Sequence, residues 1–304
     1  MASHRRVAAL TRAVACAAGV AAAAGTFLRG SGATLTVTSP RGETFEMAVD
    51  GVYANNAMRV VAEGIGWDVF TLLVVAPALL ATSWWVARGS ARGRLVAAGL
   101  LGYVAYMYLE YAVTWAFGPL FALHVAIYAA SLVGVAWIAI TLAADGHRPR
   151  VDATFPRRSW AMLSVGMASL LTVMWIGRIV ASLGGPVALH GETTMTVQAL
   201  DLGLVVPLSV STATLALRRH PAGLLATAAF AVMFTAMCAA IGAMLVGAWI
   251  VTGVLELPPI VLFGAAAVAG LIATIRMYAA IRLEAVEPDR PAYVSRRPDL
   301  VSAG

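Results

Sequence analysis

Eight long apolar stretches recur along the whole chain, and they constrain its fold more than any other feature. Each is close to the roughly 20 residues that a helix needs to cross the hydrocarbon core of a bilayer. Because main-chain groups in lipid must satisfy their own hydrogen bonds, each stretch is expected to be a helix. The sequence therefore predicts an all-α integral membrane protein with eight transmembrane helices. Their expected ranges are 9–28, 67–87, 95–116, 120–143, 159–183, 198–217, 222–249 and 257–281.

The composition excludes an ordinary soluble domain. Of the 304 residues, 61% are hydrophobic and only 12% are charged, whereas a soluble domain carries about 25% charged residues. The net charge of +6 lies in short segments between the apolar stretches, so it indicates membrane topology and not nucleic-acid binding. All 21 basic residues are arginine, and the abundance of Ala, Gly and Val is typical of a bacterial protein from a GC-rich genome.

Arginine is concentrated in alternate connecting segments. Short cytoplasmic loops retain positive charge, and 16 of the 21 arginines lie in one set of alternating segments, against three in the other set. This asymmetry predicts that both termini are cytoplasmic and that the protein lies in the cell membrane, with residues 284–304 as a flexible cytoplasmic tail. The three arginines expected outside are Arg29, Arg41 and Arg59.

The first apolar stretch has a second interpretation. A basic start and an Ala-rich core are also typical of a cleaved signal peptide. Cleavage would leave seven spans and an external N-terminus. Retention is favoured because this stretch corresponds to the fifth span in the repeat described below.

The first outer loop, residues 29–66, is the only sizeable segment between spans. Polar and apolar residues alternate on both sides of Ser39-Pro40-Arg41-Gly42, and proline at the second position with glycine at the fourth fits a β-turn. Alternation of this kind predicts two short strands. We expect a β-hairpin over residues 34–48 that packs on the membrane domain, followed by a short amphipathic helix over residues 52–64.

The second and sixth spans share a pattern. Each opens with an aspartate, passes through Val-Val to a proline, and ends eleven residues later at an arginine. The prolines and the arginines are each 130 positions apart. The pattern predicts two pseudo-repeated four-helix halves, residues 1–145 and 146–283, in parallel orientation. The paired residues are Asp68, Pro77 and Arg88 in one span and Asp201, Pro207 and Arg218 in the other.

Five ionisable residues from five spans lie at a similar outer depth. Ionisable groups inside spans are costly and are therefore candidates for function. An outward-facing polar pocket could bring them together, and its acidic lining would favour a proton or a small cationic solute. The candidates for ligand binding are Asp68, Glu110, His124, Arg178 and Asp201.

Each candidate also has a purely structural explanation. Asp68 and Asp201 could cap the N-termini of their helices. Arg178 could pair with an acid or extend to the lipid headgroups, and His124 could be a hydrogen-bonded interfacial residue. Glu110 is the hardest to explain in this way, because a carboxyl group near the membrane interior needs a partner or water.

The third span is rich in tyrosine. Tyr103, Tyr106 and Tyr111 are expected near one helical face, so Tyr106 and Tyr111 are secondary candidates beside Glu110. The alternative is ordinary packing together with an outer aromatic belt.

Motifs for common cofactors and catalytic centres are absent from the sequence. It contains no lysine and hence no phosphate-binding loop ending in lysine, no HExxH and no GxSxG. The five histidines show no metal-ligand spacing, and Cys16 and Cys238 stand alone inside apolar spans. We therefore predict no metal, no cofactor and no catalytic residue, and favour a non-enzymatic role.

Two segments carry a resemblance to a family. GYVAYMYLEYAVTWAFGPLFALHVAIYAASL, residues 102–132, and VQALDLGLVVPL, residues 197–208, resemble uncharacterised bacterial multi-pass membrane proteins with a tyrosine-rich helix, an FGPLF-type turn and a QALDLG helix that continues to VPL. The resemblance covers about a third of the chain and implies no activity. Similar proteins would carry a lysine in the span after the basic loop, where this chain has Met233 and Phe234.

These observations lead to two functional expectations. The first is a transporter-like or ligand-binding membrane protein with an outward-facing polar pocket. The alternative is an accessory or sensory protein that acts through its outer loop. The lipid bilayer is the expected partner, nucleic acid is not, and the sequence leaves the oligomeric state open.

Overall fold

A computed structural model describes residues 2–145, 148–184, 188–189, 191–192 and 194–284. Within these residues, eight helices are long and apolar enough to cross a membrane, as predicted. Two of the eight are interrupted by a short π-helical segment, labelled η. The helices are α1 (Ala2–Phe27), α2–η1–α3 (Met58–Phe70, Thr71–Val75, Ala76–Ala87), α4 (Ala91–Thr114), α5 (Phe121–Ala144), α6 (Arg157–Gly184), α7–η2–α8 (Thr196–Leu200, Asp201–Val205, Val206–Leu217), α9 (Pro221–Thr252) and α10 (Leu257–Ala280).

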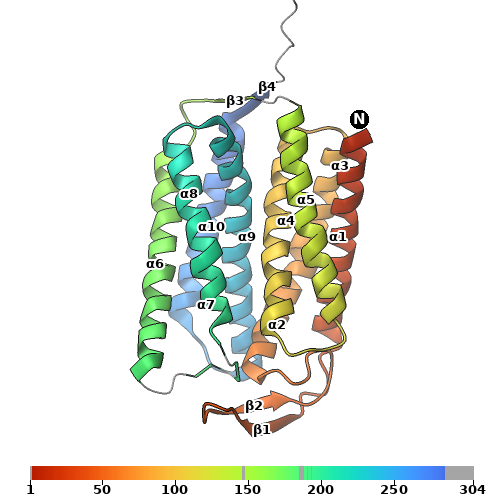
Figure 1. Ribbon diagram of the computed structural model, residues 1–304, viewed down its shortest axis with the longest axis vertical. Coiled ribbons are helices and arrows are strands. Elements are labelled where there is room, and N and C mark those ends of the chain that lie inside the picture. Colours follow the sequence, from red (N-terminus) through yellow and green to blue (C-terminus); the bar gives the residue numbers. More distant parts are fainter. Residues whose placement is uncertain (1, 146–147, 185–187, 190, 193, 285–304) are drawn as a thin grey trace, which may run out of the picture.

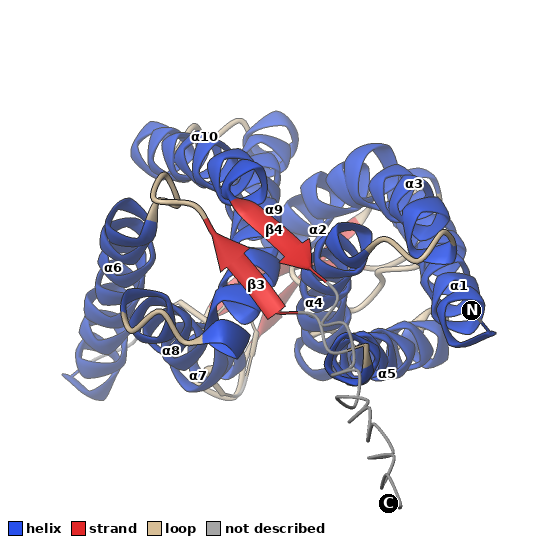
Figure 2. Cartoon of the chain, turned by 90° about the horizontal axis from the view of Figure 1, so that it is seen from above, coloured by secondary structure: helices blue, strands red, loops and turns tan. Residues whose placement is uncertain are grey.

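The long helices form two groups of four that stand side by side (Figures 1 and 2). In the first group α1 packs on α3, α3 on α4, α4 on α5, and α5 on α1. The second group repeats this order of neighbours with α6, α8, α9 and α10. The two groups meet where α9 packs against α2 and α4.

Small residues allow the two groups to approach closely. A Cβ atom on Gly66 of α2 would lie 2.2 Å from the carbonyl oxygen of Ala243 on α9. A Cβ atom on Gly247 would lie 2.9 Å from the Cα atom of Gly66. Glycine at both positions therefore sets the distance between α2 and α9, as small residues do where membrane helices cross.

The second span is longer than predicted. The helix begins at Met58 and not at residue 67, and turns and bends replace the start of the amphipathic helix expected over residues 52–64. The correction has a physical reason, because α2 packs against α9, and Val61, Ala62 and residues 64–66 are buried and continue the helix directly. Asp68 consequently lies inside the helix, about 15 Å from its start at 1.5 Å per residue.

Both interrupted spans widen into a π-helical segment at the same place relative to a proline. Thr71–Val75 precedes Pro77, and Asp201–Val205 precedes Pro207. Proline has no main-chain N–H and crowds the preceding turn, and a π-turn is one way in which a helix accommodates this disruption.

The predicted hairpin is confirmed. Strands β1 (Thr34–Thr38) and β2 (Thr44–Ala48) pair in antiparallel register, and the Gly42 N–H donates to Ser39 O across the turn. The hairpin lies at the lower end of the molecule in Figure 1, where β2 contacts α2 and the hairpin meets the loop between α6 and α7. There the Leu189 N–H donates to Glu43 Oε2 over 2.9 Å, and the Phe45 ring lies against Gly191.

A second small sheet joins the two groups at the end opposite the hairpin (Figure 1). Strand β3 (Arg148–Val151) pairs with β4 (Ile281–Glu284), and neither strand was predicted. An Arg92 NH2 group donates to Ile281 O over 2.6 Å, which ties β4 to α4. Except for Glu284, the predicted flexible tail 284–304 lies outside the described residues.

An ion-pair cluster closes the end of the first group that lies opposite the hairpin. The Asp145 carboxyl lies 2.7 Å from Arg94 NH2 and 3.1 Å from His4 Nε2. Partial burial raises the pKa of Asp145, but the hydrogen bonds and charges of Arg94 and His4 outweigh it, so the pKa lies below its ordinary value. The cluster joins the ends of α1, α4 and α5.

Candidate functional site

Asp68 is held by two tyrosines inside the first group of helices. The Tyr53 hydroxyl donates to Asp68 Oδ2 over 2.6 Å, and the Tyr111 hydroxyl lies 3.1 Å from Asp68 Oδ1. The backbone of Gly25 seals the other side, since a Cβ atom there would lie 1.9 Å from Asp68 Oδ2. Asp68 does not cap a helix, because α2 begins at Met58 without a side-chain cap. It is a buried, hydrogen-bonded residue.

His124 belongs to the same neighbourhood through its ring. The ring centroid lies 4.9 Å from that of Tyr111 and 5.5 Å from that of Tyr108. Tyr53 and Trp115 also stack near Tyr111. His124 therefore completes an aromatic cluster around Asp68 in the first group.

Asp201 lies on the other side of α4, between the two groups of helices. The Tyr106 hydroxyl donates a short hydrogen bond to Asp201 Oδ1, and Trp175 Nε1 of α6 donates to Oδ2 over 2.8 Å. Asp201 is the first residue of η2, five residues into its span, so it also does not cap the helix. The side chain thus connects α4 of the first group with α6 and η2 of the second.

Glu110 is the most unusual of the candidates. Its side chain is only 5% exposed, yet none of the residues that the structure describes donates a hydrogen bond to its carboxyl group. The charged groups that act on it are all acidic, namely Asp201, Glu192 and Glu63. An ionised carboxyl group that is buried without a partner is very costly, so this position requires a bound proton or a bound cation.

A second buried acceptor lies on the helix that packs against α4. On α7 the side-chain oxygen of Gln198 is buried without a hydrogen-bond partner in the described part of the chain. Tyr106 and Trp175 use their donors on Asp201. Glu110 on α4 and Gln198 on α7 therefore each carry an acceptor without a donor among the described residues.

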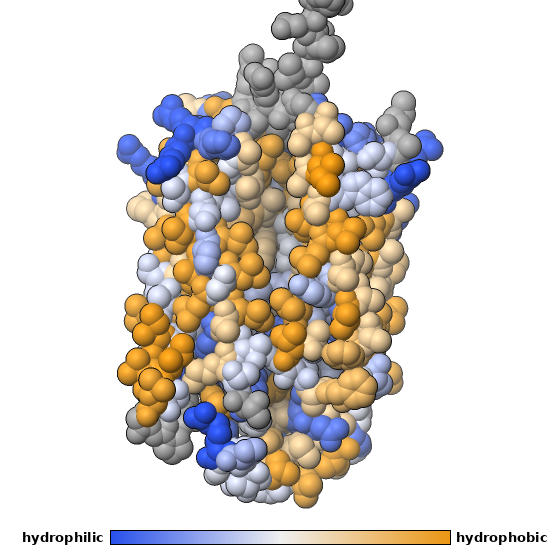
Figure 3. Space-filling view, viewed as in Figure 1, coloured by the Kyte–Doolittle hydropathy of each residue, from blue (hydrophilic) through white to orange (hydrophobic). Residues whose placement is uncertain are grey.

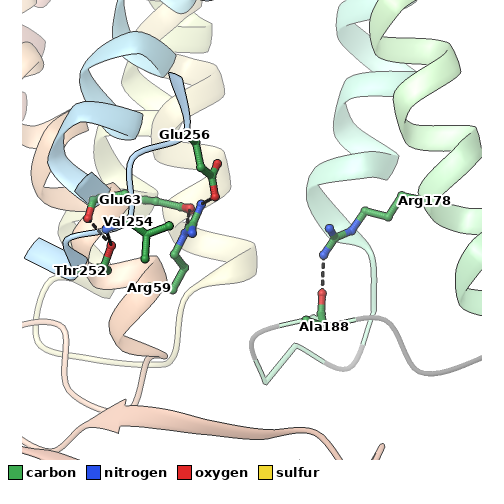
Figure 4. Close-up of polar contacts among 8 residues, drawn as sticks. Arg59, Glu63, Arg178, Ala188, Thr252, Val254 and Glu256 are labelled. Carbon is green, nitrogen blue, oxygen red and sulfur yellow. Dashed lines mark hydrogen bonds and ion pairs between the residues drawn. The ribbon is translucent and has the colours of Figure 1, made fainter. Parts of the chain in front are cut away.

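Two arginines flank this acidic region without entering it (Figure 4). Arg59 pairs with Glu63 over 2.6 Å and with Glu256 over 2.9 Å. Arg178 extends from α6 and donates a short hydrogen bond to Ala188 O. The positive charge of Arg59 is already shared by two carboxylates, and that of Arg178 acts on Glu192.

Glu192 lies in the loop before α7 and carries a strongly perturbed carboxyl group. The pKa of Glu192 is raised from 4.5 to about 7; burial is the largest cause, nearby Arg178 lowers the pKa, and Glu63 raises it. Acids with a raised pKa near neutrality gather at functional sites. Glu192 thus adds a titratable group to the acidic region around Glu110.

The five predicted residues do not share one pocket. Asp68 and His124 lie on one side of α4, Glu110 and Asp201 lie on the other, and Arg178 lies at the edge of the second set. Tyr111 bonds Asp68 while Tyr106 bonds Asp201, so the prediction of one tyrosine face is wrong. An offset of five residues turns about 140° around a helix with 3.6 residues per turn, which separates these two side chains.

Sequence reasoning missed four residues of these clusters. Tyr53, Glu63 and Glu192 lie outside the predicted spans, and Trp175 has no polar neighbour in the sequence to single it out. Only ionisable residues within the predicted spans were candidates for the site. Glu63 would have been one of them if the second span had been predicted to begin at Met58.

The described residues contain no group of three or more His, Cys, Asp or Glu side chains arranged to hold a metal ion. Comparisons of this chain with protein-family models, curated proteins and solved structures find no match.

Proposed function

We propose that this chain is an integral protein of the cell membrane, with eight spanning helices and cytoplasmic termini. Its large apolar side chains support this proposal, because many of them are exposed on the outward faces of the helices (Figure 3). Leu183 is 83% exposed and Ile250 is 74% exposed. Apolar surface on this scale is unstable in water and stable against lipid. The arginine-rich loops lie at the end that we assign to the cytoplasm.

We also propose that the two groups of helices are pseudo-repeats. The shared order of neighbours supports this, as do the π-helical segments at an offset of 130 positions, Thr71–Val75 and Asp201–Val205. In this register Asp201 corresponds to Thr71, and Asp68 corresponds to Gln198. The two aspartates are therefore not equivalent, which agrees with their different surroundings.

The function that this geometry favours is binding of a proton or a small cationic solute between the two halves. The observation that carries the proposal is Glu110, buried without a partner beside Asp201 and Glu192. Negative charge and unpaired acceptors would attract a cation that can donate hydrogen bonds, such as an ammonium group. Tyr106 and Trp175 would orient Asp201 toward it. Sites between repeated halves are common in transporters.

A thermal-unfolding titration of the purified protein in lipid nanodiscs tests this proposal. Methylammonium is the probe, and the pH is varied across neutrality. A ligand at about 100 times its dissociation constant stabilises the folded state by about 2.7 kcal/mol. We expect methylammonium to raise the unfolding temperature of the wild type, and to have little effect on Glu110→Gln and Asp201→Asn.

Asp68→Asn is the matched control. Asp68 is as deeply buried as Glu110, but it already accepts hydrogen bonds from two tyrosines. This variant should be less stable at every methylammonium concentration and should keep the full ligand response. A response that survives in Glu110→Gln and Asp201→Asn would refute the proposed site. A wild type that does not respond to methylammonium at any pH would refute cation binding.

A further inference from the structure

A long apolar groove runs between the two halves on the face shown in Figure 3. Its volume is about 800 Å³, which is within the usual range for a ligand pocket, roughly 300–1,000 Å³. Helices α4 and α9 form its floor, and α5 and α8 form its walls. Residues on the four helices include Leu95, Gly102, Tyr128, Leu132, Leu208 and Ala226.

The groove has the length of an extended alkyl chain. On α4 it extends from Leu95 to Leu109, which is about 21 Å at 1.5 Å per residue. That is about two thirds of the roughly 30 Å hydrocarbon core of a bilayer. Because the groove is open along its side, a chain could enter from the lipid without crossing the headgroup region.

The outer end of the groove meets the acidic region described above. Tyr106 lines the groove, and its hydroxyl group donates to Asp201. Glu110 is one helical turn further toward the outside on the same helix. The groove therefore reaches the acidic region through Tyr106, and neither Asp201 nor Glu110 itself lines it. Glu110 has no hydrogen-bond partner among the described residues.

We infer that the groove and the acidic region together bind a cationic amphiphile, with one alkyl chain along the groove and an ammonium head at Glu110 and Asp201. This inference rests on the proposed cation site and extends it by naming the class of ligand. The carboxyl groups of Glu110 and Asp201 favour a cationic head group on the ligand. They would repel a phosphate group, and an uncharged head group would leave Glu110 without a counter-charge. The apolar walls select the chain, because each buried CH₂ contributes about 0.8 kcal/mol.

The test compares three probes in nanodiscs: propylammonium, decylammonium and decanol. For the wild type we expect decylammonium to raise the unfolding temperature at a concentration at least tenfold lower than propylammonium, and decanol to have little effect. Glu110→Gln should abolish both ammonium responses. Trp175 donates to Asp201, so a change in the tryptophan fluorescence spectrum that is lost in Trp175→Phe reports binding at the head position.

Filling the groove tests the position of the chain. Ala226 and Ala139 line the groove from α9 and α5, and both are exposed, so phenylalanine fits at either site without disturbing the packed interior. We expect Ala226→Phe and Ala139→Phe to remove the advantage of decylammonium and to keep the propylammonium response. Ala269→Phe, on an exposed face of α10 outside the groove, is the matched control and should behave as the wild type.

The outcomes separate the two proposals. Equal responses to propylammonium and decylammonium, both lost in Glu110→Gln, would keep the cation site and overturn the groove inference. A decanol response as large as that of decylammonium would also overturn it, because the effect would then reflect partition into lipid. The absence of any ammonium response in the wild type would overturn the cation site and the groove inference together.

Discussion

At the scale of single residues, the buried acidic residues differ in whether a neighbouring side chain donates a hydrogen bond to their carboxyl group. Asp68 has Tyr53 and Tyr111, and Asp201 has Tyr106 and Trp175. Glu110 has no donor among the described residues, and Glu192 lies near it in the acidic region. Asp68, with its two donors, stabilises the fold. Asp201 and Glu110 together form the proposed cation site, and Glu192 near them makes its charge depend on pH.

Glu192 should make both stability and cation binding depend on pH. Its pKa in the folded protein is about 7, against an ordinary value of 4.5. Between these values the folded protein holds a proton that the unfolded chain has released, so the free energy of unfolding falls as the pH rises through this window. Methylammonium should bind more tightly as the pH rises through about 7, because ionisation adds negative charge beside Glu110.

Glu192→Gln should flatten both dependences, measured by thermal unfolding with and without methylammonium. Glu46→Gln is the control. Glu46 is fully exposed on the hairpin, and a hydrogen bond from Thr36 lowers its pKa, so it does not titrate in this window. An unchanged pH profile in Glu192→Gln would show that another group is responsible.

Tyr53 and Asp68 should matter for stability alone. Tyr53→Phe removes a 2.6 Å hydrogen bond to a buried carboxyl group and should lower the free energy of unfolding by about 1–3 kcal/mol. The measurement is denaturant or thermal unfolding in the same nanodiscs, with the methylammonium response as a second readout. A loss of that response in Tyr53→Phe would link the Asp68 cluster to binding, contrary to the division proposed here.

At the scale of elements, α9 determines how the two halves fit together. It crosses α2 at Gly66 and Gly247, where the two backbones nearly touch. It also crosses α4 at Gly99, where a Cβ atom would lie 2.3 Å from Ala229 O. The same helices form the floor of the groove and carry Glu110, so their spacing sets the geometry of the candidate site.

Gly66→Ala should therefore destabilise the protein. The added methyl group would meet the Ala243 carbonyl oxygen, a main-chain atom that cannot rotate away, and overpacking of this kind costs about 1–3 kcal/mol. Gly166→Ala, on α6, is the matched control because nothing lies within 4 Å of its added carbon. Thermal unfolding of both variants tests the crossing, and equal stability would mean that α2 and α9 separate more easily than this geometry implies.

At the scale of the whole molecule, the two ends differ in charge and in structure. The hairpin lies at one end and the β3–β4 sheet at the other (Figure 1). Glu192 of the acidic region lies in the loop that contacts the hairpin, whereas Arg92 and Arg94 begin α4 at the end with the β3–β4 sheet. With the proposed topology, a solute from outside the cell would meet the acidic region first. Anionic lipids of the cytoplasmic leaflet would meet the arginines.

Labelling of single cysteines tests this orientation. In a background with Cys16→Ala and Cys238→Ala, a membrane-impermeant maleimide added to intact cells should label Arg41→Cys in the hairpin turn. It should not label Thr154→Cys, which is exposed just before α6. Labelling of both positions after the cells are lysed is the control, and the reverse pattern in intact cells would invert the proposed topology.

The sequence by itself determined the eight apolar helices and the hairpin. Both depend on local properties, namely hydrophobic length in the helices, and alternation around Pro40 and Gly42 in the hairpin. The start of α2 was not predicted, because Gly64 and Gly66 weaken the helical pattern of the local sequence. In the structure these glycines pack against Trp115 and α9. Strands β3 and β4 were not predicted, because they pair two segments that lie more than 100 residues apart in the sequence.

The tertiary structure alone decided which polar residues meet. Depth in the membrane placed Asp68, Glu110 and Asp201 at one level, but depth does not fix the direction of a side chain around its helix. The packing of α4 against α3, α5 and α9 turns Tyr111 toward Asp68 and Tyr106 toward Asp201. Glu110 consequently faces acids from distant parts of the chain, and that arrangement arises from long-range packing that no local pattern contains.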